Sequence, residues 1–219
     1  MLKNPSNDIV LARKPVYETT KLIFDLWACS CALMVLFPIL MLIGLGILVT
    51  SGRPILYRGL RTGRYGKEFL IYKFRSMQVG SDQGPGTTSK GDTRVTKIGR
   101  VMRRYKLDEL PQLFNVLRGE MSLVGPRPEL PQYTARYEGR ERLILSVRPG
   151  ITDFSSIYFS DLSSLIDDEN PDESFEQNYL GEKNRLRIKY VDERSMSTDF
   201  VLLARTLIVV FKKLCSRKR

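Results

Sequence analysis

Histidine is absent from this chain of 219 residues, and cysteine is scarce. The only cysteines are Cys29, Cys31 and Cys215. Histidine-based catalysis, histidine-rich metal sites and four-cysteine zinc sites are therefore excluded. The cysteines form no disulfide framework, which fits a reducing compartment. Any acid, base or nucleophile must come from Asp, Glu, Lys, Tyr, Ser or a bound cofactor.

The sequence also lacks internal repeats and the phosphate-loop motif GxxxxGK(S/T), which argues against an ordinary nucleotide triphosphatase. The net charge of +11 predicts an anionic partner, such as nucleic acid, a membrane surface or a phosphorylated substrate. Residues 53–118 contain 15 Lys and Arg against 5 Asp and Glu, whereas residues 151–199 contain 5 against 12. This separation favours a confined anionic site or one membrane-facing side over nucleic acid.

No charged residue occurs between Leu26 and Gly52. These 27 residues are long enough to cross a bilayer core of about 30 Å as a helix. The run is too long for a cleaved signal peptide and has no small-residue cleavage site before Arg53. Basic residues flank the run on both sides, which predicts that both ends lie on the cytoplasmic side of the membrane.

Pro38 lies near the middle of this apolar run and is expected to kink the helix. A break at this point allows a re-entrant hairpin that returns to the face it entered. Prolines also occur in ordinary transmembrane helices, so these residues alone leave a kinked single span open. A buried helix of a soluble protein is the least favoured alternative.

The C-terminal residues 200–219 combine apolar side chains with a basic end. This pattern predicts an amphipathic helix in the membrane interface, with its basic residues near anionic lipid. A helix packed on the domain core is an equal alternative.

The central residues predict a mixed domain. Residues 54–59 and 67–77 are typical of short strands, and residues 79–92 predict a loop that is either a lid or a plain connection. Helical spacing follows over 96–117. A further helix is expected over about 175–191, in an acidic region to which we assign no chemistry.

Asp108 and Glu109 lie between two apolar sets of helical spacing and are expected at the start of the second helix. Amide groups at a helix start and nearby basic residues predict that both carboxylates are ionised. Ionised carboxylates can bind Mg²⁺ or attack phosphorus. A simple helix cap is the structural alternative.

Two Arg-Pro turns follow this acidic pair. Prolines flank Arg127 on both sides, and Arg148 is followed by Pro149 and Gly150. A rigid backbone holds a guanidinium in place, which suits phosphate binding, although solvated turns remain the alternative.

Several segments together resemble the bacterial sugar transferase family of monotopic phosphoglycosyl transferases. They are KLIFDL before the proline-broken apolar run, YKFRSM, VRPGIT and the long block TRVTKIGRVMRRYKLDELPQLFNVLRGEMSLVGPRPE. The resemblance runs from about Lys21 to Thr152 and continues weakly to the C-terminus. It implies transfer of a phosphosugar from a nucleoside diphosphate sugar, most readily a UDP-sugar, to a polyprenyl phosphate. It also implies a place on the cytoplasmic face of the bacterial inner membrane and favours the re-entrant hairpin.

The resemblance implies roles for individual residues. Asp108 corresponds to a nucleophile that forms an aspartyl-phosphosugar intermediate and helps to bind Mg²⁺, with Glu109 as its partner. Arg103 and Arg127 correspond to arginines near the donor phosphates and the nucleotide. Lys73 and Arg75 of YKFRSM, and Arg148 by its Arg-Pro turn, are further candidates for phosphate binding.

The expected fold is α+β, a small and mostly helical domain with a short sheet and membrane-associated ends. The expected segments are an N-terminal cytoplasmic segment (1–20), a membrane hairpin (21–52), a catalytic domain (53–199) and an interfacial helix with a basic tail (200–219).

Two departures from the family pattern stand out. Phe37 precedes Pro38 where the family often has serine, and Ser160 stands where an arginine is expected. The second departure affects the expected sugar-binding details. A membrane-tethered binding protein or a scaffold without activity is the alternative function.

Overall fold

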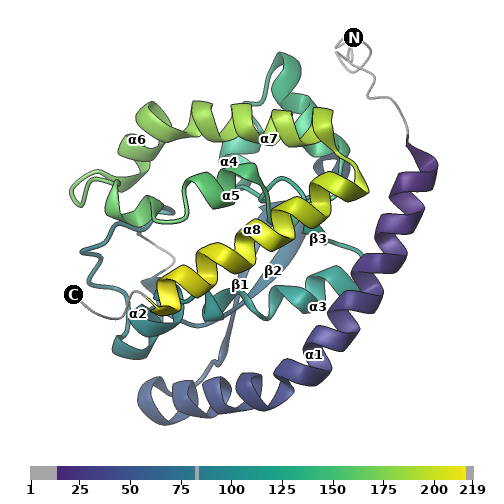
Figure 1. Cartoon of the computed structure of the whole chain (residues 1–219). Coiled ribbons are helices and arrows are strands. Elements are labelled where there is room, and N and C mark those ends of the chain that lie inside the picture. Colours follow the sequence, from purple (N-terminus) through teal and green to yellow (C-terminus); the bar gives the residue numbers. More distant parts are fainter. Residues whose placement is uncertain (1–13, 82–83, 216–219) are drawn as a thin grey trace.

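The computed structural model describes residues 14–81 and 84–215. Helices dominate, and two small sheets lie among them (Figure 1). The expected mixture of helices with short strands is confirmed. In chain order the α-helices and strands are α1 (Pro15–Ser51), β1 (Leu56–Thr62), β2 (Glu68–Phe74), α2 (Lys97–Arg104), α3 (Gln112–Leu117), β3 (Ser122–Val124), α4 (Pro131–Thr134), β4 (Gly150–Thr152), α5 (Phe154–Tyr158), α6 (Pro171–Phe175), α7 (Gly181–Glu193) and α8 (Met196–Cys215).

β1 and β2 form an antiparallel hairpin whose register runs from Leu56 opposite Phe74 to Thr62 opposite Glu68. Both strands come from the two segments predicted as strands. Alternate side chains of β2 enter the core, as the period of a strand requires, and Ile71 packs there against α3. The hairpin therefore carries one apolar face against the helices.

β3 and β4 form a second, parallel pair that the sequence did not predict. Ser122 lies opposite Gly150, and the two chains continue so close together that a Cβ atom on Gly150 would lie 2.0 Å from the amide nitrogen of Gly125. Only a residue without a side chain fits here. This pairing holds the Pro-Arg-Pro turn at Arg127 beside the strand that follows Arg148.

α1 is a long helix that bends sharply in its middle (Figure 1). Pro38 lies inside it and supplies the expected physical reason for the bend. The helix begins at Pro15, before the predicted membrane hairpin (21–52). Residues 1–13 of the predicted N-terminal segment lie outside the described residues.

Both ends of α1 contact the same globular domain. Near the start, Lys21 Nζ lies 2.7 Å from Asp199 Oδ2 of α8, and both side chains are buried. At the other end, Arg75 donates from Nη2 to the carbonyl oxygens of Ser51 and Gly52. Between these ends the inner side of the helix also packs on the domain, through Cys29 and Leu33 before the bend and Ile47 after it.

The outer surface of α1 is apolar and exposed. Only 6% of its most apolar 18-residue window is buried, and its length and composition suffice to cross a membrane. An exposed apolar surface of this extent indicates a membrane or protein partner. Its large exposed side chains include Trp27, Met34, Val35, Phe37, Met41, Leu42, Leu45 and Val49.

α8 packs on the domain, which is one of the two alternatives that the sequence left open, and it also has an exposed apolar side. Its inner side packs on the domain, where Leu202 is buried and Thr206 shares a hydrogen bond with Thr152 of β4. Its other side exposes Phe200, Ile208 and Phe211. The helix is therefore part of the core on one side and apolar toward the exterior on the other. Residues 216–219 of the predicted tail lie outside the described residues.

The Lys21–Asp199 pair gives a testable prediction for stability. Asp199→Ala leaves a buried ammonium without its carboxylate, so the free energy of unfolding should fall by about 3–5 kcal/mol. Thermal unfolding in detergent measures the change. The matched control is Asp192→Ala, which breaks an exposed pair with Arg140 and should cost less than about 1 kcal/mol. Equal losses in both variants would contradict the structural role of the pair.

Candidate functional site

Asp108 and Glu109 lie in a short 3-10 turn, Leu107–Glu109, that joins α2 to α3. The predicted position at the start of the second helix was therefore wrong. α2 ends at Arg104, and Lys106 adopts a left-handed conformation with φ of 59°, which interrupts helical hydrogen bonding. α3 begins only after Pro111, which has no amide proton.

Asp108 is almost fully buried in this turn, with 5% of its surface exposed. Its Oδ1 atom has no hydrogen-bond partner within the described part of the chain. Burial, and then the negative charge of Glu109, raise the pKa of Asp108 against the opposing effect of Lys73. The sequence predicts that surrounding charges favour ionisation of both acids, and for Asp108 the direction of the pKa shift is the reverse.

Glu109 is held in the ionised form by two cations. Its Oε1 accepts a hydrogen bond from Arg127 Nη2 and lies 3.4 Å from Lys73 Nζ. Burial alone would raise the pKa of Glu109, but Arg127 and Lys73 outweigh it and hold the pKa well below its usual range. For this carboxylate the direction of the pKa shift agrees with the expected ionisation. The pair thus contains one firmly charged acid and one acid whose proton affinity is increased.

Lys73 projects from β2 beside Glu109, at the edge of the hairpin. Burial lowers its pKa to about 8, although the charge of Glu109 partly offsets the effect. Arg103 lies on the last turn of α2 and donates from Nε to Ser76 Oγ at 2.8 Å. These two predicted phosphate-binding residues come together with the acidic pair.

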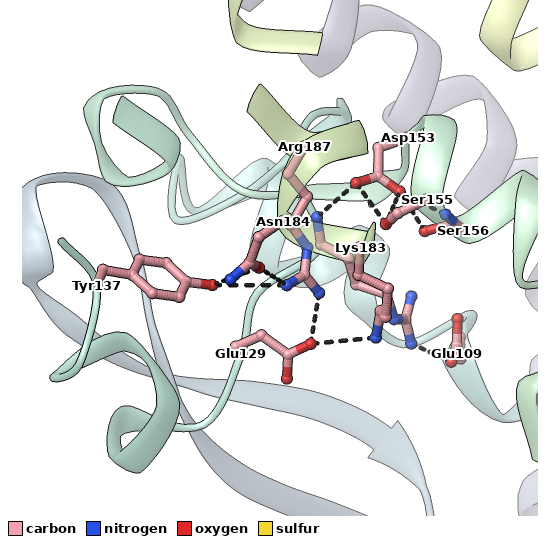
Figure 2. Close-up of polar contacts among 10 residues, drawn as sticks. Glu109, Glu129, Tyr137, Asp153, Ser155, Ser156, Lys183, Asn184 and Arg187 are labelled. Carbon is pink, nitrogen blue, oxygen red and sulfur yellow. Dashed lines mark hydrogen bonds and ion pairs between the residues drawn. The ribbon is translucent and has the colours of Figure 1, made fainter. Parts of the chain in front are cut away.

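Arg127 is fixed on three sides. Its amide donates to Asp153 Oδ2 and its Nη1 donates to the carbonyl of Ile151, both at 3.2 Å, while Nη2 reaches Glu109. Figure 2 shows Glu109 at one edge of this polar network and Asp153 at another. In this structure the guanidinium of Arg127 binds Glu109. The contact with a nucleotide that the family resemblance implies would be an additional one.

Arg75 and Arg148 lie apart from this group. Arg75 binds the carbonyl groups at the end of α1. Arg148 lines a small cavity of about 30 Å³ with Tyr17 and Lys21, near the start of α1. The structure therefore does not place Arg148 beside Asp108.

Two cavities meet at Lys73 and Arg103, which line both of them. Asp108 and Glu109 line a cavity of about 690 Å³, within the size range of small-molecule sites. The adjoining cavity measures about 900 Å³. The first cavity carries many hydroxyl groups, from Thr87, Thr88, Ser89, Ser160 and Ser163. Ser160, where the family pattern predicts an arginine, thus lies in the same cavity as Asp108.

A buried ionic group that the sequence did not predict supports the Arg127 turn. Glu129 Oε1 binds Arg187 Nη2 and lies 3.2 Å from Lys183 Nζ, with both cations on α7 (Figure 2). Arg187 is fully buried. The signal available in the sequence was the four-residue spacing of Lys183 and Arg187, which places them on one helix face. This acidic region, to which no chemistry was assigned, therefore supports the site.

The fit of Mg²⁺ rests on Asp108. Among the described residues no group of three or more acidic, histidine or cysteine side chains could hold a metal ion. The unpartnered Oδ1 of Asp108 is a suitable oxygen ligand, while Oε1 of Glu109 is already held by cations. Mg²⁺ commonly binds one or two carboxylates and completes its shell with water and substrate phosphates. Asp108 therefore fits a site that a diphosphate substrate completes.

Known proteins share much of this sequence. An undecaprenyl-phosphate glucose phosphotransferase of Komagataeibacter xylinus is 44% identical over 164 residues, which are 70% of this chain and 31% of that protein. A UDP-glucose:undecaprenyl-phosphate glucose-1-phosphate transferase of Xanthomonas campestris pv. campestris is 40% identical over 150 residues, 66% of this chain and 31% of that protein. The chain thus spans about a third of these two relatives.

A shorter relative matches over more of its own length. A putative undecaprenyl-phosphate N-acetylgalactosaminyl 1-phosphate transferase of Bacillus subtilis is 40% identical over 123 residues, 56% of this chain and 69% of that protein. The model of the family described as bacterial sugar transferase matches residues 16–213, from the start of α1 to the end of α8. The chain belongs to the bacterial sugar transferase family.

Proposed function

We propose that this protein transfers a phosphosugar from a nucleoside diphosphate sugar to a polyprenyl phosphate and releases a nucleoside monophosphate. The observation that carries the proposal is the buried Asp108 carboxylate, whose Oδ1 is unpartnered within the described structure and which lines a cavity with Lys73 and Arg103. The relatives' names include UDP-glucose and undecaprenyl phosphate, so a UDP-sugar and undecaprenyl phosphate are the substrates to test first.

Asp108 acts as the nucleophile in the first step. One of its carboxylate oxygens attacks the phosphorus that bears the sugar, and the bond from that phosphorus to the bridging oxygen breaks. The nucleoside monophosphate leaves with the bridging oxygen and its electron pair. Burial keeps water from Asp108, so the ionised carboxylate is poorly solvated and more reactive toward phosphorus.

The second step regenerates Asp108. A phosphate oxygen of the polyprenyl phosphate attacks the same phosphorus, and the bond to Asp108 breaks. Lys73 and Arg103 line the cavity with Asp108 and would stabilise negative charge on the phosphoryl oxygens in both steps. When bound at Asp108 and the donor diphosphate, Mg²⁺ would offset the charge that otherwise repels a carboxylate. Glu109 and Arg127 position the turn that carries Asp108.

The membrane arrangement follows from α1 and α8. We propose that α1 enters the cytoplasmic face of the bacterial inner membrane as a re-entrant hairpin, because both of its ends contact one domain. The exposed apolar side chains of α8 would lie in the same interface. The domain would then lie at the level of the lipid headgroups, where the lipid phosphate is found. Anionic lipid is the expected membrane partner.

The transfer is tested with purified protein in detergent, Mg²⁺ and a panel of nucleotide sugars with undecaprenyl phosphate. Asp108→Asn should reduce release of nucleoside monophosphate by about 10³-fold or more, because the amide is not a nucleophile. Asp192→Asn, an exposed residue of α7, is the control and should leave the rate unchanged. A rate for Asp108→Asn within tenfold of the unmodified chain would contradict the assigned nucleophile. Binding of donor without turnover across the panel would instead support a scaffold.

The hairpin is tested with single cysteines at Val16 and Leu60, both exposed positions near the two ends of α1, in a chain without its native cysteines. A membrane-impermeant maleimide applied from the periplasmic side should label neither position, and both should react after the membrane is permeabilised. Labelling of one position alone from the periplasm would indicate a spanning helix.

A further inference from the structure

The cavity of about 900 Å³ beside the Asp108 site is strongly cationic. Besides Lys73 and Arg103, its lining includes Arg53, Arg58, Arg61, Arg75 and Arg94. Among its described lining residues there is no Asp or Glu. Arg94 is paired with Asp92 and Lys73 with Glu109, and both of these carboxylates lie outside the lining. This charge favours an anionic ligand.

Arg75 gives an independent indication of the same kind. It is only 6% exposed, and Nη2 donates to the two carbonyl groups at the end of α1. Its Nε and Nη1 atoms are buried and have no hydrogen-bond partner in the described structure. Buried polar groups are normally hydrogen-bonded, and a buried guanidinium more so than most. A phosphate in the cavity is the kind of acceptor these atoms lack.

Part of the remaining wall of this cavity is apolar and adjoins the membrane helix. Leu48 of α1 lines it, one turn before the helix ends at Ser51. Ile55 and Leu56, which follow α1, and Leu130 continue the apolar wall. The cavity therefore joins cationic groups to an apolar surface at the C-terminal end of α1. This combination matches a phosphate attached to a hydrocarbon chain.

The Asp108 cavity has a different chemical character. It is lined by the hydroxyl groups named above, by seven Lys and Arg residues and by three carboxylates, those of Asp108, Glu109 and Asp161. No residue of α1 is among its described lining residues. Hydroxyl groups and cations suit the sugar and phosphates of a nucleotide sugar. The Asp108 cavity thus suits a water-soluble donor, and the arginine-lined cavity, which reaches α1, suits a lipid phosphate.

We propose that the arginine-lined cavity binds the phosphate group of the polyprenyl phosphate acceptor, while the Asp108 cavity binds the donor. This rests on the proposed transfer and adds a separate place for each substrate. Lys73 and Arg103 line both cavities. The acceptor phosphate would therefore lie on one side of these two side chains, and the phosphosugar on Asp108 would lie on the other. The same two cations would then contact the donor phosphates first and the acceptor phosphate second.

The test uses the double variant Arg53→Gln/Arg58→Gln, whose two exposed arginines line only the arginine-lined cavity. The matched control is Arg140→Gln/Arg185→Gln, which removes two exposed arginines that line neither cavity. The full chain is placed in phosphatidylcholine nanodiscs with undecaprenyl phosphate. Release of nucleoside monophosphate is measured without acceptor, as a burst, and then as a function of acceptor concentration.

The double variant should raise the KM for undecaprenyl phosphate by about tenfold or more, because two charge-assisted contacts are lost. The burst and the kcat/KM for the donor should stay within about twofold of the unmodified chain, which also shows that the variant is folded. The control should change neither. A weaker donor with an unchanged acceptor, or no change in either, would overturn the proposal.

Two further measurements distinguish an acceptor site from a general site for anionic lipid, and lipid binding from transfer. Replacing part of the phosphatidylcholine with phosphatidylglycerol should leave the KM for the acceptor unchanged. A rise in this KM equal to that of the double variant would mean a general site for anionic lipid and would overturn the proposal.

Native mass spectrometry counts undecaprenyl phosphate bound to the chain without any turnover. If the unmodified chain shows no burst, the proposed transfer fails, yet lost lipid binding in the double variant alone would still support the cavity.

Discussion

The ion pair between Glu109 and Arg127 is the interaction on which the site depends. It connects the short turn that carries Asp108 to the Pro-Arg-Pro turn beside β4. It also keeps Glu109 ionised inside the protein, and that fixed negative charge adds to burial in raising the pKa of Asp108. The two neighbouring acids therefore have different electrostatic properties although they share one turn. The ion pair between Glu109 and Arg127 therefore affects both the position of Asp108 and its pKa.

Support for this ion pair comes from the acidic half of the chain. Glu129, two residues after Arg127, binds Lys183 and Arg187 of α7, so a helix distant in sequence holds the turn from behind. The pKa of Glu129 is held well below its usual range, because Lys183 and Arg187 outweigh the effect of burial. A buried carboxylate between two cations leaves the turn little freedom. The two helices with exposed apolar sides add a second constraint, since α1 is tied to α8 through Lys21 and Asp199.

Much of this arrangement could be predicted from the sequence, and the failures have physical causes. The bend in α1 and the two strands of the β1–β2 hairpin follow local patterns of proline and alternation, whereas the meeting of Asp108 with Lys73 and Arg103 was expected from the family resemblance. The pairing of β3 with β4 depends on contacts between distant segments, which short-range patterns do not contain. The direction of the pKa shift at Asp108 failed for a related reason, because burial is a tertiary property and outweighed the nearby cations. The supporting role of Glu129 was not predicted, because its partners lie in an acidic region whose composition is typical of a solvent-exposed surface.

The proposed mechanism requires Asp108 to carry the phosphosugar between donor and acceptor. Mass spectrometry of the digested chain, after incubation with a turned-over nucleotide sugar in the absence of acceptor, tests this requirement most directly. We expect a phosphosugar adduct on the peptide that contains Asp108, and its disappearance when undecaprenyl phosphate is added. Transfer to the lipid with no adduct at any time, or with the adduct on another residue, would contradict the mechanism.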